Sequence, residues 1–136
     1  MTTLSALTLV RNRQAHLDRL VEGLTISASP PDELIVIDMS DAPVTLPSVD
    51  FPVRVERLAG DALPLAAARN LAAALASGDI LLFLDVDCIV SSAVCDRMQA
   101  VLAEHDAVIC PEVLYLPAGA VRPGPLSEVD LSAAGR

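Results

Sequence analysis

The chain has 136 residues and a formal net charge of −9, and all nine of its basic side chains are arginines. This length fits one domain with its own core, and without a basic stripe the composition argues against a nucleic-acid partner. The apolar runs are far shorter than the roughly 20 residues of a membrane span, so no transmembrane segment is expected. The three cysteines lack metal-ligand spacing and resemble reduced, small apolar residues, which predicts a cytoplasmic protein.

Strand and helix patterns alternate along the first part of the chain. Residues 4–10 form an apolar run of strand length. An amphipathic helix is predicted next, from apolar side chains at helical spacing, Leu17, Leu20, Val21 and Leu24. Residues 33–38 then form an apolar run that ends in Asp38, typical of a strand buried on both faces of a parallel sheet. A Pro-containing loop over 39–52 leads to a half-exposed strand at 53–57.

The second half continues the same alternation. Residues 65–76 are rich in alanine and predict a helix that stops at Ser77-Gly78, with the glycine as a left-handed C-cap. Residues 80–84 form another buried strand. A helix is expected from 93 to about 104, and Ser91 or Ser92 would cap it.

Beyond that helix we expect one more strand and then a tail. Residues 107–110 predict a last strand, and the domain is expected to cover residues 1–116. Residues 117–136 are rich in Pro, Gly and Ala without periodicity, which predicts a flexible tail. Strands that alternate with helices predict an α/β domain with a mainly parallel, Rossmann-like sheet, in which ligands bind at the carboxyl ends of the strands.

Two acids, Asp85 and Asp87, follow the predicted strand at 80–84. If the chain stays extended through Asp87, both side chains project to the same side. Two carboxylates in one small volume favour a cation between them, and hard oxygen ligands suit Mg²⁺ or Mn²⁺. Such an ion would bridge the diphosphate of a nucleotide. The alternative interpretation is that these acids only cap a helix or solvate a turn.

Other polar residues stand at the predicted strand ends. Asp38 suits hydrogen bonding to a ribose hydroxyl or a base, or else it is an acid at a loop entry. Arg69 lies in an apolar helix, where it would neutralise a diphosphate or extend into solvent. Residues 11–13, Arg-Asn-Arg, supply donors at the end of the first strand.

These segments together resemble the donor-binding half of family 2 glycosyltransferases, over about residues 4 to 116. The segments that carry the resemblance are Leu4 to Val10 with Arg11-Asn12-Arg13, Glu33 to Asp38, Ala67-Ala68-Arg69-Asn70-Leu71 and Phe83-Leu84-Asp85-Val86-Asp87. The resemblance implies a GT-A fold, a nucleotide-diphosphate sugar donor, a divalent metal and transfer to an acceptor that the sequence does not identify.

The resemblance also implies roles for single residues. The residues that would flank the nucleoside are Val10, Arg11 and Asn12, within Leu9 to Arg13. Asp38 would contact the base, and Arg69 and Asn70 would lie near the diphosphate. Asp85 would meet the ribose or the metal, and Asp87 would ligate the metal. The family's usual Pro-Thr-Tyr-Asn is here Leu9-Val10-Arg11-Asn12, which leaves the donor nucleotide open.

Members of the family continue into an acceptor-binding half that carries the general base. We therefore expect this half to be absent here, and apolar residues 107–116 to pack against an added domain or a second copy in a homodimer. Two alternatives remain. One is a haloacid-dehalogenase-like phosphohydrolase, whose aspartates also form D-x-D, although the sequence has no lysine to neutralise an aspartyl phosphate. The other is a non-catalytic nucleotide-sugar-binding fragment.

Overall fold

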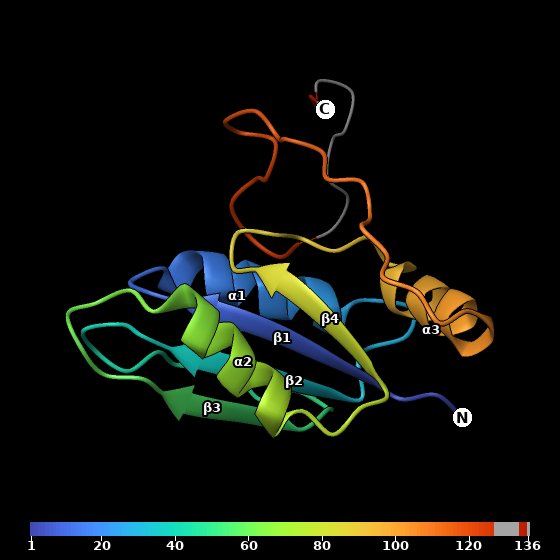
Figure 1. Ribbon diagram of the computed structural model, residues 1–136. Helices are drawn as coiled ribbons and strands as arrows, with labels where there is room; N and C mark the ends of the chain where they lie inside the picture. Colours follow the sequence, from blue (N-terminus) through green and yellow to red (C-terminus); the bar gives the residue numbers. More distant parts are fainter. Residues whose placement is uncertain (127–133, 136) are drawn as a thin grey trace. The chain divides into compact units, whose positions relative to one another are not determined.

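The computed structural model describes residues 1–126 and 134–135. The chain divides into two compact units, 1–105 and 106–136, and the first unit holds the sheet and its helices (Figure 1). The elements in chain order are β1 (Leu4–Val10), α1 (Gln14–Thr25), β2 (Glu33–Asp38), β3 (Val53–Arg57), α2 (Leu65–Leu75), β4 (Ile80–Asp85) and α3 (Val94–Glu104).

The four strands form one parallel sheet in the order β3-β2-β1-β4. Strand β1 lies between β2 and β4, with Leu7 in register with Ile35 on one side and Phe83 on the other. Since all strands run the same way, their carboxyl ends meet at one edge (Figure 1). The predicted α/β fold with a parallel sheet is therefore confirmed.

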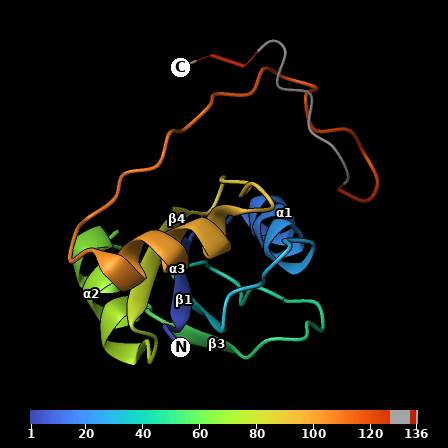
Figure 2. The ribbon, with the colours of Figure 1, turned by 90° about the vertical axis from the view of Figure 1, so that its right-hand side faces the viewer.

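Helices cover both faces of the sheet. Helices α1 and α3 pack with one face, around buried residues such as Leu20 and Cys95, whereas α2 packs on the other face through Ala68 and Ala72. Figure 2 shows α1 and α2 on opposite sides of the strands. Because α2 covers β1 and β2, the β4 side chains that point to its side stay partly uncovered, with Phe83 47% exposed.

Gly78 packs closely against strand β1, a role that the sequence pattern did not indicate. It is not a left-handed C-cap, because the positive-φ glycines of the described residues are Gly60, Gly119 and Gly124. Its backbone N–H donates to the Ser5 hydroxyl at 2.8 Å, and that hydroxyl donates to Glu33 at 2.6 Å. An added Cβ would lie 2.6 Å from Ser5 Oγ and 2.7 Å from Ser5 N. The glycine is therefore needed for close packing against β1.

Two other local predictions are wrong. In the described part of the chain, neither Ser91 nor Ser92 caps α3 with its side chain; Ala93 precedes the helix, and the Val94 N–H donates to the Ser91 carbonyl at 3.1 Å. Residues 107–110 pair with no strand among the described residues. A strand needs a neighbour for its backbone groups, and local β-propensity does not supply one.

The C-terminal prediction is largely untested. The second unit contains an antiparallel bridge between Tyr115 and Gly135. The flexible tail predicted for 117–136 falls partly on residues 127–133 and 136, which lie outside the described residues, and so it stays a prediction. None of the helices in residues 1–126 has the length and apolar character needed to cross a bilayer.

Thr8 carries a polar atom without a partner in the core. The residue is 1% exposed, and among the described residues its hydroxyl has no hydrogen-bond partner. Thr8→Val keeps the shape and removes this cost, so we expect the free energy of unfolding to rise by about 1 kcal/mol in urea denaturation. A loss of stability would instead mean that the hydroxyl has a partner, such as a buried water.

Gly78→Ala tests the close approach to β1. The added methyl group would displace Ser5 and disturb its bond to Glu33, so we expect the free energy of unfolding to fall by about 2 kcal/mol. Ala74→Gly in the exposed face of α2 is the control, and it should cost about 1 kcal/mol through helix propensity alone. Equal effects of the two variants would contradict the packing role.

Candidate functional site

The carboxyl edge of the sheet contains a point where the chain connections diverge. The chain leaves β1 for β2 through α1 on one face, and it reaches β4 from β3 through α2 on the other face. The carboxyl ends of β1 and β4 thus form a topological switch point, the place where open α/β sheets bind ligands. Helices α1 and α2 also begin at this edge. Within the described residues neither has a side-chain cap, although the first N–H of α2, that of Leu65, donates to the Leu63 carbonyl at 2.9 Å. The positive ends of both helix dipoles therefore face this edge of the sheet.

The acidic pair lies at this switch point. Strand β4 ends at Asp85, and the Cys88 N–H donates to the Asp85 carbonyl at 2.9 Å. Residues 85–88 therefore form a turn, and the condition for the two side chains to project to the same side, an extended chain through Asp87, is not met. Both carboxylates are exposed. Burial, and then the charges of Asp87 and Asp85, raise the pKa of the Cys88 thiol.

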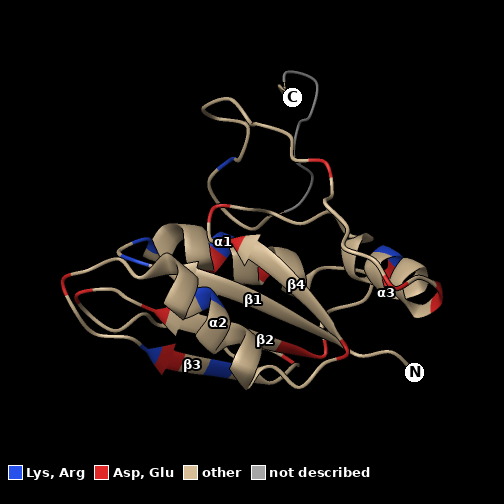
Figure 3. Ribbon diagram, in the orientation of Figure 1, with Lys and Arg blue, Asp and Glu red and all other residues tan. Residues whose placement is uncertain are grey.

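Arg69 reaches from α2 toward the end of β4. Its Nη2 lies 3.9 Å from Asp85 Oδ1, with the two side chains 50% and 80% exposed. An ion pair that is this exposed adds little stability to the fold. Both side chains can therefore leave it to contact a ligand. Asn70, the next residue on α2, is exposed. Figure 3 shows a basic residue on α2 and an acidic end of β4, while the other acids are spread over loops, helices and the strands β2 and β3.

A metal ion on Asp85 and Asp87 would need further ligand atoms from water or from a bound ligand. The described residues contain no group of three or more His, Cys, Asp or Glu side chains that could hold a metal ion. Mg²⁺ in nucleotide sites is commonly bound by one or two carboxylates, with water and phosphate oxygens filling the other positions. Two exposed carboxylates match that donor set, and they do not match an all-protein cage. A bound metal here stays a prediction.

Asp38 is 1% exposed and holds the loop that follows β2. Its carboxylate accepts hydrogen bonds from the N–H groups of Ser40, at 2.9 Å, and Val44, at 3.0 Å, and Arg57 Nη1 lies 3.7 Å away. Burial raises the pKa of Asp38, but the hydrogen bonds from Val44 and Ser40, with the Arg57 charge, outweigh it and hold the pKa below its usual value. These contacts match the alternative of an acid at a loop entry, and contact with a base stays a prediction.

The residues after β1 are also held by the chain itself. The Val10 carbonyl accepts from the Met39 N–H at 2.8 Å, and Arg11 Nη1 donates to the Ala62 carbonyl at 3.4 Å. Asn12 is the non-glycine residue with positive φ in the described chain, at 54°, and its side chain pairs with a loop residue, Asp41.

Two polar residues that organise this edge, Ser40 and Asp41, were not predicted from the sequence. The Ser40 hydroxyl accepts from the Asn12 N–H at 2.9 Å, and its carbonyl accepts from Arg57 Nη2 at 2.7 Å. A Ser-Asp pair one residue beyond a strand that ends in an acid is typical of turns built on side-chain hydrogen bonds, and this was the available signal.

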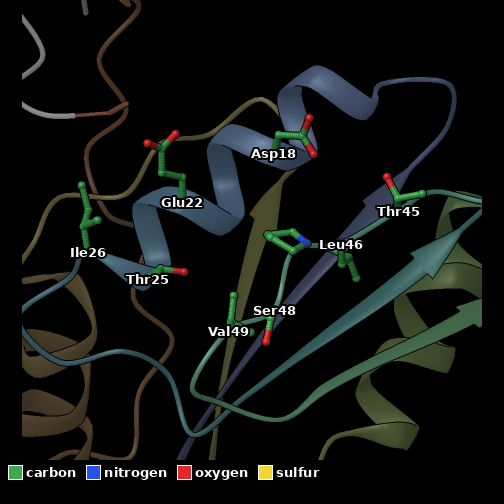
Figure 4. Close-up of a pocket in the computed structure, with 9 residues that line it drawn as sticks. Asp18, Glu22, Thr25, Ile26, Thr45, Leu46, Ser48 and Val49 are labelled. Atoms are coloured by element: carbon green, nitrogen blue, oxygen red, sulfur yellow. The ribbon is translucent and has the colours of Figure 1, made fainter. Parts of the chain in front are cut away.

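Two hollows lie near α1. The larger, of about 570 Å³, lies between the flank of α1 and residues 45–49, and it contains none of the predicted site residues (Figure 4). The smaller, of about 290 Å³, lies at the start of α1 and includes Asn12. Its lining residues are Asn12, Arg13, Gln14, Ser40, Ala42, Pro43 and Val44.

Asp38→Asn tests the hold on the loop. A buried acceptor of two N–H bonds loses charge, so we expect the free energy of unfolding at pH 7 to fall by about 2 kcal/mol. Because the folded pKa of Asp38 lies below the ordinary 3.8, its stabilisation is present above that value and is lost as the pH falls through the folded pKa. The gap between wild type and variant, followed by urea denaturation, should shrink below about pH 4; a gap independent of pH would contradict this.

Comparison with known proteins agrees with this architecture. The model of the family Glycosyl transferase family 2 matches residues 5–127. The crystal structure of S. aureus TarS 1-349 aligns with a TM-score of 0.59 and 19% identity, covering 81% of this chain and 38% of that chain. A second S. aureus TarS structure aligns with a TM-score of 0.58 and 21% identity, over 75% of this chain and 20% of that one. Among curated proteins none matches.

At these identities the TarS structures show the fold alone, which is of the GT-A type. The chain spans 38% and 20% of the two chains that it matches. The family match covers most of the sequence, and it does not favour the phosphohydrolase alternative. The chain belongs to glycosyl transferase family 2.

Proposed function

We propose that this chain binds the nucleotide-diphosphate sugar donor of a glycosyltransferase at the switch point between β1 and β4, with Mn²⁺ or Mg²⁺ on Asp85 and Asp87. The observation that carries the proposal is the position of Asp85. It ends β4 at the switch point and lies beside Arg69, so an anionic ligand would meet a metal-binding carboxylate and a guanidinium together.

Charge explains why a cation belongs in this site. A protein with a net charge of −9 repels a bare diphosphate. The uncapped starts of α1 and α2 and the guanidinium of Arg69 offset this only in part. A bound divalent ion would neutralise the charge that develops on the departing nucleoside diphosphate. With such an ion held by Asp85, Arg69 would be able to hydrogen bond a phosphate oxygen.

The nucleoside would lie on the β1 side of the switch point. Val10 ends β1, Arg11 and Asn12 follow it, and the loop held by Asp38 lies next to them. Asn70 follows Arg69 on α2 and would lie near the diphosphate. The identity of the base and of the sugar stays open, and sugar transfer by the whole enzyme rests on membership of the family.

Two further parts of the proposal concern the environment of the chain. Its three thiols are free, which supports a reducing compartment, the cytoplasm.

Apolar side chains in residues 107–116 are exposed, with Val108 94% exposed, so we propose that this stretch packs against a second copy or an added domain. Light scattering that finds a monomer at high concentration would exclude the second copy.

Calorimetric titration with UDP and with GDP tests the metal-assisted site. We expect binding with Mn²⁺ and none with EDTA. Asp87→Asn should weaken binding in Mn²⁺ at least about tenfold, or ~1.4 kcal/mol. The control is Asp96→Asn, which removes an exposed acid from α3. It changes the net charge by the same amount as Asp87→Asn, but it lies away from the proposed metal site. Equal affinity with Mn²⁺ and with EDTA would refute the metal bridge.

A further inference from the structure

Two side-chain amides bind the loop after β2 to the start of α1. Asn12 Nδ2 donates to Asp41 Oδ2 at 2.9 Å, and the Asp41 N–H donates back to Asn12 Oδ1 at 3.0 Å. Gln14, two residues later, pairs in the same two-way manner with the backbone of Thr45. Its Nε2 donates to the Thr45 carbonyl at 2.8 Å, and the Thr45 N–H donates to Gln14 Oε1 at 2.9 Å. We refer to Asn12 and Gln14, with these partners, as the amide clamp.

Backbone geometry adds to the clamp at Asn12. A left-handed φ of 54° is costly for most residues, but Asn tolerates it. This conformation allows the Asn12 N–H to donate to Ser40 Oγ at 2.9 Å, while the side chain reaches Asp41. Three hydrogen bonds therefore join one strained residue to the loop, and both polar groups of its side chain have partners.

The clamp frames the smaller hollow. Between its two attachment points, Asp41 and Thr45, the loop carries residues 42–44, which line the hollow of about 290 Å³ together with Asn12 and Gln14. The Asp38 carboxylate also holds this segment, because it accepts a hydrogen bond from the Val44 N–H. Residues 41–45 are thus fixed at three places, although they contain no helix or strand.

We infer that Asn12 and Gln14 are positioning residues, which hold residues 41–45 as the nucleoside-side wall of the donor site and do not contact the donor with their amides. This rests on the proposed function. It differs from the direct donor contact expected for Asn12 from the sequence. A wall ordered before binding spares the ligand the entropy of ordering it, so the clamp raises affinity for the nucleoside and leaves the diphosphate contacts unchanged.

A charge swap tests the clamp without deleting side chains. Asn12→Asp places a second carboxylate opposite that of Asp41 and turns a hydrogen bond into repulsion. Asp41→Asn in the same chain restores a donor and an acceptor with their positions exchanged. Asp also tolerates the left-handed conformation, so the backbone is kept. Gln99→Ala is the control, since it removes an amide that donates to the Thr2 carbonyl at 2.9 Å, next to the opposite end of β1.

Two readouts are needed for each protein. Titration with UDP, GDP and pyrophosphate in Mn²⁺ measures the site, and amide hydrogen exchange of residues 39–45 measures order in the wall. We expect Asn12→Asp to weaken nucleotide binding about tenfold, with pyrophosphate within about twofold, and to speed exchange about tenfold. The double variant should recover both values, and Gln99→Ala should change neither.

The outcomes separate the inference from the proposed function. If wild type binds a nucleotide and Asn12→Asp binds it equally well, the clamp does not position the wall, and the donor site stands. Equal weakening of pyrophosphate and nucleotide would also overturn the inference, because the effect would then not be confined to the nucleoside side. If wild type binds neither UDP nor GDP, the proposed function fails and the inference fails with it.

Discussion

Strand β1 is hydrogen-bonded along both of its edges, to β2 and to β4, and six of its seven residues are buried. Because both pairings are parallel, each connection must return across a face of the sheet, which places helices on both faces. The same constraint brings the ends of β1, β2 and β4 to one edge and starts α1 and α2 there. The candidate site is therefore a product of strand pairing, since its residues come from segments far apart in the sequence.

The sequence allowed the strands to be predicted well, because a buried strand in a parallel sheet needs a continuous apolar run that polar residues end. The bounds 4–10 and 33–38 agree with the structure for this reason. The bounds 53–57 also agree, but that half-exposed strand was indicated by alternating apolar and polar residues. Predictions failed where a distant partner decides the outcome. Gly78 packs against Ser5, 73 positions away. Residues 107–110 have no strand neighbour in the described part of the chain, and their apolar character alone could not provide one.

The site could be predicted in composition and only partly in geometry. An acid at the end of β4 and an arginine on α2 do lie together, since topology fixes both positions. Spacing could not show that the chain turns at Asp85, because a backbone hydrogen bond to Cys88 sets that path. Nor could it show that Asp38 and Asn12 satisfy donors and acceptors of the loop at 39–45, a segment without any periodicity.

The most direct test of the central claim is to map where a metal ion and a nucleotide bind together on the chain. Mn²⁺ broadens the NMR signals of nearby amides, so spectra of the chain with UDP or GDP and a trace of Mn²⁺ would map the ion on the fold. We predict the strongest nucleotide-dependent broadening at residues 85–88, with weaker effects at 11–13. Broadening centred on the hollow at residues 45–49, or spread evenly over the acidic surface, would contradict a donor site at the switch point.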